Sequence, residues 1–158
     1  MNYNPNEIRE RQLTPETYGA KGALNVPTLT LNTMLTYALQ DEYLAQARYD
    51  TILQKFGAIR PFTQIKQAEM RHISALLPLF QRYFVPIPEN HAINFVTPPA
   101  TLQNAFAAGV QAEIDNINMY DRFLTFNIPA DMQMVFTQLR NASVNHLAAF
   151  QRGLSATS

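Results

Sequence analysis

A carboxylate and an imidazole stand three residues apart within residues 62–76, as Glu69 and His72. One helical turn separates such a pair, so both side chains would lie on the same face of a helix. Apolar residues at helical spacing surround them, which places both on the face that a helix normally buries. A buried carboxylate needs a proton, a charged partner or a metal ion. The pair therefore predicts a metal site, with a buried Glu–His hydrogen bond as the alternative.

Three further residues that could bind a metal ion interrupt apolar seams in the same way, namely Glu42, Glu113 and His146. Carboxylates are hard oxygen donors that can bridge two cations, and neutral imidazole suits iron, manganese or zinc. We therefore predict one site with five ligands: Glu42, Glu69, His72, Glu113 and His146. Asp41 stands beside Glu42, and a shift of one residue in the helical register would make it the ligand instead.

Helical periodicity extends over four segments, and caps or helix breakers delimit them. Thr30 is a candidate N-cap for the first helix, and Gly57 is a natural stop for it. Pro61 suits the first position of the second helix, whose last turns should be kinked by Pro78. The expected helices cover residues 31–56, 61–83, 101–126 and 130–152.

These helices predict a single all-α domain over residues 29–153, preceded by an N-terminal arm over residues 1–28. The arm is rich in Pro and Gly and has no sustained periodicity. We expect it to be extended along the domain or along a neighbouring subunit, with a loose terminus as the alternative. Residues 154–158 form a polar tail that we expect to fray. The Pro-rich connection at 85–99 is long enough to let the second and third helices run parallel.

The sequence also repeats itself. A first alignment of the chain with itself superposes the first and third helices and places Glu42 on Glu113. A second alignment superposes the second and fourth helices and places His72 on His146. Within residues 62–76 and their counterparts, six of fifteen positions are identical, whereas average residue usage would give about one. We therefore predict a four-helix bundle built from two duplicated helical hairpins, with a pseudo-twofold axis that brings the five ligands to one level of its core.

Ser143 breaks the repeat, because it stands where the duplication demands a second bridging Glu. Glu69 would then be the single bridging carboxylate, and the site would hold two metal ions, or one tightly and a second weakly. Ser143 leaves room for water, hydroxide or an exogenous ligand, and its hydroxyl is a candidate hydrogen-bond donor to the site. A small residue filling a vacated place is the alternative.

Tyr49 and Tyr120 follow Glu42 and Glu113 by two helical turns on the same face. They could donate hydrogen bonds to the ligand carboxylates, or carry electrons or a radical. The alternative is a pair of core aromatic residues with satisfied hydroxyl groups.

The pattern resembles the ferritin-like superfamily of ferritins, bacterioferritins and rubrerythrins. The rubrerythrin-like part reads Glu-Tyr-Leu-Ala-Gln-Ala-Arg-Tyr over residues 42–49. Residues 30–152 are more closely similar to a bacterial ferritin-like domain family of unknown function. That resemblance depends on Asp41-Glu42-Tyr43, Arg60-Pro61-Phe62, Ala68-Glu69 with Arg71-His72, Ala112-Glu113-Ile114 with Tyr120-Asp121, and Asn145-His146-Leu147 with Ala149-Phe150.

The resemblance implies a four-helix bundle and, more weakly, an activity. The first expectation is a dinuclear iron or manganese site with oxidase, ferroxidase or peroxide-handling activity. Glu42 and Glu113 would be terminal ligands, Glu69 the bridge, and each histidine the cap of one metal ion. Without cysteine the chain has neither thiolate ligands nor a rubredoxin module, so external electrons would come from a partner protein. The alternatives are a structural or binding bundle with a mononuclear or structural site, such as zinc, and a ferritin-type storage shell.

The overall composition limits which partners and cellular locations we expect. The 158 residues are 47% hydrophobic and 15% charged, with twelve basic and twelve acidic side chains. This balance argues against nucleic acid as a partner. No apolar stretch approaches the length that spans a bilayer. The polar start lacks the features of a signal peptide, so we expect a cytoplasmic protein. The sequence is compatible with either a monomer or a homo-oligomer.

Overall fold

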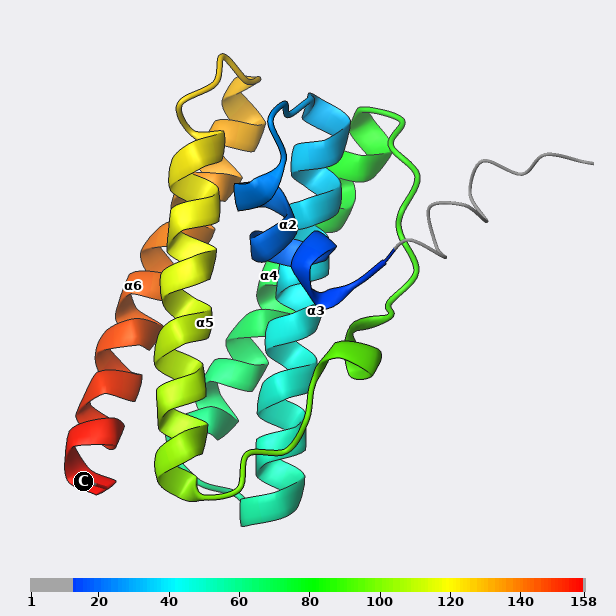
Figure 1. Ribbon diagram of the computed structural model, residues 1–158. Helices are drawn as coiled ribbons and strands as arrows, with labels where there is room; N and C mark the ends of the chain where they lie inside the picture. Colours follow the sequence, from blue (N-terminus) through cyan, green and yellow to red (C-terminus); the bar gives the residue numbers. More distant parts are fainter. Residues whose placement is uncertain (1–12, 158) are drawn as a thin grey trace, which may run out of the picture.

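The computed structural model describes residues 13–157, and every regular element in that range is helical (Figure 1). The all-α prediction is therefore confirmed. Predictions for residues 1–12 and 158 lie outside the described range. The four long helices are α3 (Leu31–Phe56), α4 (Phe62–Arg82), α5 (Leu102–Phe123) and α6 (Ala130–Thr157). The short elements are the 3-10 helices η1 (Pro15–Thr17) and η2 (Ala92–Phe95) and the helix α2 (Gly19–Asn25).

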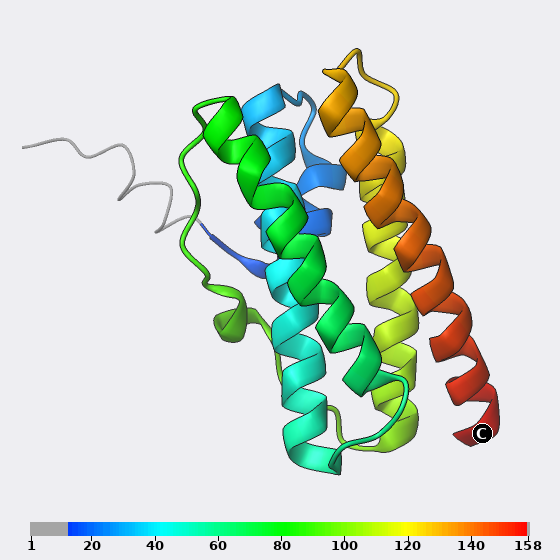
Figure 2. The same cartoon turned by 180° about the vertical axis from the view of Figure 1, so that it is seen from behind.

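The four long helices lie side by side as two hairpins. The most extensive contacts join α3 to α4 and α5 to α6, and smaller ones join α3 to α5 and α4 to α6. Figure 2 shows α4 and α6 next to each other on the back of the molecule. The connection at residues 83–101 runs the length of the molecule, so α4 and α5 point in the same direction (Figure 1).

Local sequence explains where α3 and α5 begin and where α3 ends. The hydroxyl of Thr30 accepts a hydrogen bond from the backbone N–H of Thr33 at 3.2 Å, and the hydroxyl of Thr101 accepts one from the N–H of Asn104 at 3.0 Å. These bonds satisfy donors that a helix leaves unpaired at its start. Gly57 ends α3 with a φ of 89°, a conformation that glycine adopts without strain.

Residues 19–25 form the helix α2, where the sequence predicted an extended arm. The backbone N–H of Gly19 donates to Gln40 Oε1 at 3.0 Å, and that of Ala20 donates to Asp41 Oδ1 at 2.9 Å. Both acceptors belong to α3, so contacts between segments distant in sequence fix this helix. Gly19 also has a φ of 64°, and a Cβ there would lie 2.8 Å from Asp41 Oδ1.

The helix α6 continues to Thr157, past the end at residue 152 that the sequence predicted. Gly153 lies under the ring of Phe106, so close that a Cβ at residue 153 would overlap the ring carbons. Leu154 packs against the apolar cluster that contains Phe106 and Phe150. The polar tail is therefore helical because this turn makes tertiary contacts.

Two apolar clusters fill the interior toward opposite ends of the long helices. One is represented by Leu35, Leu39, Leu76, Phe80 and Phe136, and the other by Tyr49, Ile52, Phe62, Phe106 and Phe150. Between the two clusters, each of the four long helices contributes to a layer of buried polar side chains. No helix of the described part of the chain is both long and apolar enough to cross a membrane.

Candidate metal centre

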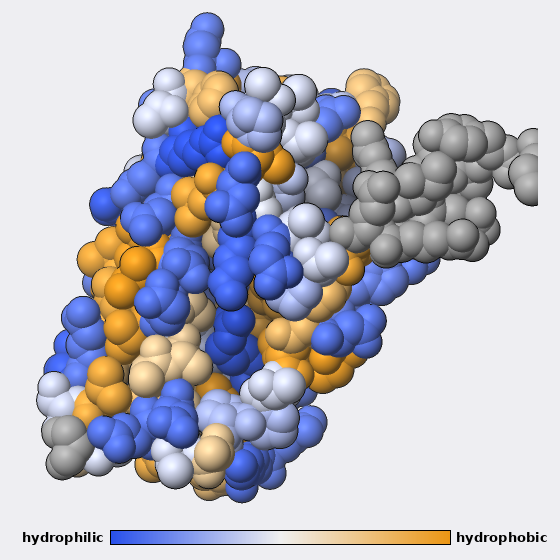
Figure 3. Space-filling view, viewed as in Figure 1, coloured by the Kyte–Doolittle hydropathy of each residue, from blue (hydrophilic) through white to orange (hydrophobic). Residues whose placement is uncertain are grey.

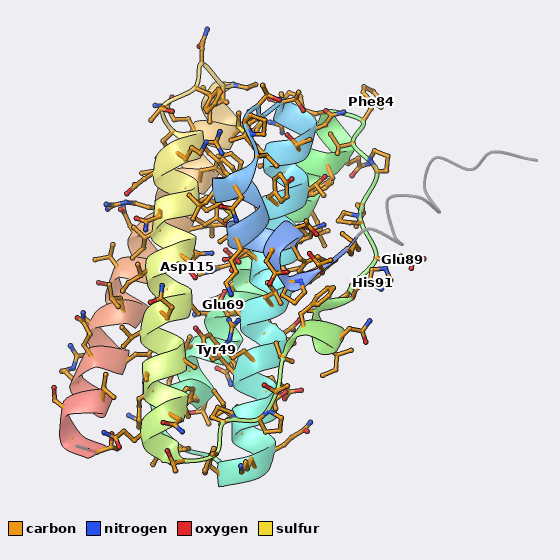
Figure 4. All side chains as sticks on the ribbon, in the orientation of Figure 1. Tyr49, Glu69, Phe84, Glu89, His91 and Asp115 are labelled. Atoms are coloured by element: carbon orange, nitrogen blue, oxygen red, sulfur yellow. The ribbon has the colours of Figure 1, made fainter. Side chains whose placement is uncertain are left out.

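The buried polar layer contains all five residues that the sequence predicted as ligands. They form two overlapping groups, in each of which one candidate ligand atom per residue lies within 4.8 Å of the others. The groups are Glu42 with Glu69 and His72, and Glu113 with Glu69 and His146. All five side chains are buried. Figure 4 shows Glu69, which is common to both groups, at mid-height between the long helices.

The carboxylate of Glu69 presents one oxygen to each histidine. Its Oε2 lies 3.2 Å from Nδ1 of His72, and its Oε1 lies 3.3 Å from Nδ1 of His146. The two imidazole rings are nearly parallel, with an interplanar angle of 14° and centroids 5.7 Å apart. A carboxylate in this position can bridge two cations, one beside each imidazole.

A second carboxylate completes each side of the cluster. Glu42 Oε2 lies 3.3 Å from Nδ1 of His72, and Glu113 Oε1 lies 3.4 Å from Nδ1 of His146. Ligand atoms bound to one metal ion at about 2.0–2.2 Å in tetrahedral geometry are roughly 3.3–3.6 Å apart. The observed separations are close to that spacing. Nδ1 of His146 is also buried and has no hydrogen-bond partner of good geometry within residues 13–157, so a cation would satisfy it.

Two tyrosines hold the outer carboxylates from the opposite helix. The hydroxyl of Tyr49 on α3 donates to Glu113 Oε1 at 2.8 Å, and that of Tyr120 on α5 donates to Glu42 Oε1 at 2.6 Å. Burial, reinforced by the neighbouring carboxylates, raises the pKa of both phenols well above the usual value. Both hydroxyl groups therefore remain protonated donors, which fixes the orientation of Glu42 and Glu113.

Ser143 contacts the cluster through Asn116, a residue that the sequence analysis missed. The Ser143 hydroxyl donates to Asn116 Oδ1 at 2.7 Å. The amide of Asn116 donates to Asp41 Oδ2 at 2.6 Å and makes a long contact of 3.5 Å with Glu42 Oε1. Asn116 follows Glu113 by three residues, the spacing that links Glu69 to His72, and this signal could have identified it.

Asp41 is buried but faces away from both histidines, toward α2 and Asn116. Its two oxygens accept hydrogen bonds from Ala20 N–H and from the Asn116 amide. Burial raises the pKa of Asp41 to about 7 despite these bonds. Of the two adjacent acids on α3, the structure therefore places Glu42 in the cluster and Asp41 in a neighbouring network.

The metal-free cluster holds compensating charges. Burial, followed by the charge of Glu69, raises the pKa of Glu42 to about 7. Burial opposes ionisation of Glu69, but its close contacts with Glu42, His146 and His72 outweigh burial and lower its pKa. Burial would lower the histidine pKa values, but the adjacent carboxylates outweigh it and raise them to about 10 for His72 and about 9 for His146. Without a metal ion, protons on both rings take the place of cations.

Comparison with known proteins adds a likeness of fold. No protein-family model matches the chain, and no curated protein matches it. A crystal structure of a hypothetical protein from Methanococcus jannaschii DSM 2661 is similar, with a TM-score of 0.72 and 22% sequence identity. The match covers 84% of this chain and 86% of that chain. At this identity, the similarity shows that the two chains share a fold and carries no function across.

Proposed function

We propose that the chain is a ferritin-like four-helix bundle that binds two divalent metal ions, iron or manganese, and uses them in oxidase, ferroxidase or peroxide-handling chemistry. The observation that carries the proposal is the position of Glu69. Its two oxygens face two different imidazole nitrogens at 3.2 and 3.3 Å, and each nitrogen also faces a second carboxylate. A buried acid placed between two such groups has the arrangement that a bridging ligand requires.

Matching interactions support the duplicated hairpins that this proposal includes. Glu42 and Tyr49 correspond to Glu113 and Tyr120 in the first alignment of the chain with itself. Each tyrosine donates to the glutamate of the other half, at 2.8 and 2.6 Å. The two hydrogen bonds therefore exchange when the halves are exchanged, as a pseudo-twofold axis requires.

A pair of ion pairs near the surface follows the same rule. Lys66 Nζ lies 2.6 Å from Asp50 Oδ1, and Arg140 Nε lies 2.9 Å from Asp121 Oδ1. Asp50 corresponds to Asp121 in the first alignment, and Lys66 corresponds to Arg140 in the second. Partly exposed ion pairs add little stability. Their value here is as independent support for the repeat.

In the proposed site, Glu42 with His72 would hold one ion and Glu113 with His146 would hold the other, and Glu69 would be shared between them. Redox metal ions supply electrons to oxygen or peroxide when bound. The protein excludes bulk water from the buried cluster and fixes the terminal carboxylates through the tyrosine hydroxyl groups. Asn116 and Ser143 border the place of the missing second bridge, where polar groups of the chain can hold water or a small exogenous ligand.

Metal content tests the proposal directly. Protein purified without a metal-affinity step should contain up to two redox metal ions per chain, and anaerobic ferrous titration should show two equivalents bound. Glu69→Gln removes the bridging charge and should abolish binding of both ions. Glu89→Gln is the matched control, because Glu89 is exposed and lies outside the cluster. Wild-type protein that binds no ferrous iron, with no change on Glu69→Gln, would disprove the proposal.

A structural or binding bundle with one non-redox ion is the second candidate. It is favoured by the Ser143–Asn116 hydrogen bond, which occupies the side of the cluster where the repeat requires another bridging acid. It is also consistent with protonated histidines balancing the buried carboxylates in the metal-free protein. One zinc ion per chain, without oxygen-dependent absorbance changes in the iron-loaded protein, would favour this candidate over the dinuclear one.

A further inference from the structure

A small pocket lies outside the metal cluster, between α2, α3, α5 and η2, with a volume of about 60 Å³. A cavity needs only about 10–15 Å³ to hold one water molecule, so this one has room for a few waters or one small ligand. Charged side chains line it from three elements: Lys21 on α2, Asp41 and Arg48 on α3, and Asp115 on α5. In Figure 3, hydrophilic residues form a band down the middle of the face on which α2 lies, and Figure 4 shows Asp115 on that face.

The acidic groups of this pocket already have partners within the protein. Asp41 accepts hydrogen bonds on both oxygens, from Ala20 N–H and from the Asn116 amide. Asp115 Oδ1 accepts a hydrogen bond from the Gln111 amide at 2.9 Å. The positive charge of Arg48 also favours the ionised form of Asp41, without a direct ion pair between the two side chains.

The two basic side chains that line the pocket lack such direct partners. Within residues 13–157, neither Lys21 nor Arg48 forms a hydrogen bond or ion pair, although Arg48 is half-buried. Tyr18, which is 1% exposed, also lines the pocket, and its hydroxyl has no hydrogen-bond partner of good geometry in the described part of the chain. Burial raises the pKa of Tyr18 to about 12, although a weak hydrogen bond from the His91 backbone to the phenol oxygen opposes the shift. The phenol is therefore neutral, and its own O–H remains available as a donor. The donors without partners around this pocket all suit an acceptor.

We propose that this pocket binds a small monocarboxylate anion of the size of formate or acetate. The planar guanidinium of Arg48 matches a carboxylate with two parallel N–H donors. Two acids line the same pocket as the two bases, which disfavours multiply charged oxyanions such as phosphate. Leu44 and Phe95 supply apolar wall that a methyl group can contact.

This site adjoins the metal cluster without sharing a ligand with it. Asp41 lines the pocket, and its Oδ2 accepts from the Asn116 amide, which also contacts Glu42 Oε1. A bound anion would therefore lie two side chains from a terminal carboxylate of the proposed metal site. Binding of the anion would not require a metal ion, because every side chain proposed to contact it belongs to the pocket.

The test is a titration of the full-length, metal-free protein with sodium acetate at constant ionic strength, followed by amide chemical shifts. Metal-free protein is required because acetate can also bind to metal ions. Saturable shifts are expected for amides of residues 18–21 and 112–115, with a millimolar dissociation constant. Arg48→Gln removes the bidentate donor and should weaken binding by about tenfold or more. Ala112→Leu fills the pocket and should abolish the saturable shifts.

Arg152→Gln is the matched control, since Arg152 is an exposed arginine on α6 outside the pocket. It should leave acetate binding unchanged. Shifts that stay linear in acetate concentration, or equal affinity in the wild type and Arg48→Gln, would overturn the proposal. Because the titration contains no metal ion, its outcome is independent of whether the Glu69 cluster binds metals.

Discussion

The two halves of the buried cluster have the same side chains but different surroundings. Glu42 faces His72 at 3.3 Å, and Glu113 faces His146 at 3.4 Å, so the distances are almost equal. Beyond these Glu–His contacts, the two halves have different hydrogen-bond partners. The Glu42 oxygen that accepts a hydrogen bond from Tyr120 also contacts the Asn116 amide. Asn116 is hydrogen-bonded in turn to Asp41 and Ser143. In the proposed duplication, the two halves therefore share the Glu and His side chains that face each other and differ in the polar groups that surround them.

The difference arises at positions that the repeat would pair. Asn116 corresponds to Ala45 in the first alignment of the chain with itself, and Ser143 corresponds to Glu69 in the second. One half thus has a hydrogen-bonded amide where the other has a methyl group. Asn116 and Ser143 form a bond with each other, so the two departures act as one unit. We expect the two proposed metal sites to be unequal for this reason.

The largest effect should come from removing one terminal carboxylate at a time. Glu42→Gln and Glu113→Gln should each lower the affinity of one ion by roughly 100-fold or more while the other ion is retained, because loss of even an outer hydrogen-bond partner costs 10–100-fold. Competitive metal titration measures the affinity of each ion, and elemental analysis counts the ions that each variant retains. If either variant loses both ions, the halves are not separable and the comparison fails.

The second prediction concerns the pH dependence of stability in the metal-free protein. His72 and His146 have folded pKa values of about 10 and about 9, above the usual value of 6.5. The native state then binds more protons than the unfolded state between these values, so the free energy of unfolding falls as pH rises. Their contribution is fully present below pH 6.5 and is lost as pH rises through the folded pKa values.

Urea denaturation of metal-free protein from pH 6.5 to about 10 measures how steeply the free energy of unfolding falls with pH. His72→Gln should remove more of this fall than His146→Gln, because the shift of His72 is the larger one. Metal-loaded protein should show the opposite trend, since the ions require neutral rings and bind more tightly at higher pH. Equal slopes in the two variants would mean that the halves do not differ electrostatically.

The third prediction compares the two tyrosines. Tyr49→Phe should destabilise the metal-free protein by about 1.5–3 kcal/mol, because a buried carboxylate loses a hydrogen bond. Tyr120→Phe should cost less, although its bond is the shorter one, because the Asn116 amide lies 3.5 Å from the same oxygen and can move toward it. Urea denaturation at one fixed pH gives both values. A larger loss for Tyr120→Phe would show that Asn116 does not support Glu42.

The buried Glu and His residues that lie together could be predicted from the sequence, whereas the groups that support them could not. Helical spacing and the repeat were enough to identify Glu69, His72 and their partners, because both rules act along the chain. The choice between Asp41 and Glu42 needs the helix orientation, which depends on what each side contacts. Asp41 faces α2, and α2 itself is fixed by hydrogen bonds to Gln40 and Asp41 rather than by its own periodicity.

Helix ends were likewise predicted correctly where local contacts set them and not where contacts between distant residues do. Thr30 and Gly57 delimit α3 through bonds and backbone conformation that are local, and both were predicted. The last turn of α6 depends on Gly153 meeting Phe106, a residue of α5 that is distant in the sequence. Composition alone made that turn look like a frayed tail. Tertiary contacts decided it.

The smallest effect should come from Ser143→Ala, which removes only the hydrogen bond to Asn116 Oδ1. The expected loss of stability is about 0.5–1.5 kcal/mol, the range for a neutral hydrogen bond. Ser74→Ala is the matched control, since its exposed hydroxyl donates to the backbone of its own helix at Met70. With metal present, Ser143→Ala should weaken only the binding step assigned to Glu42 by Glu42→Gln, because Asn116 contacts Glu42 and not Glu113. Equal weakening of both metal-binding steps would mean that Asn116 supports the whole cluster. The difference between the halves would then be a difference of structure that does not affect metal binding.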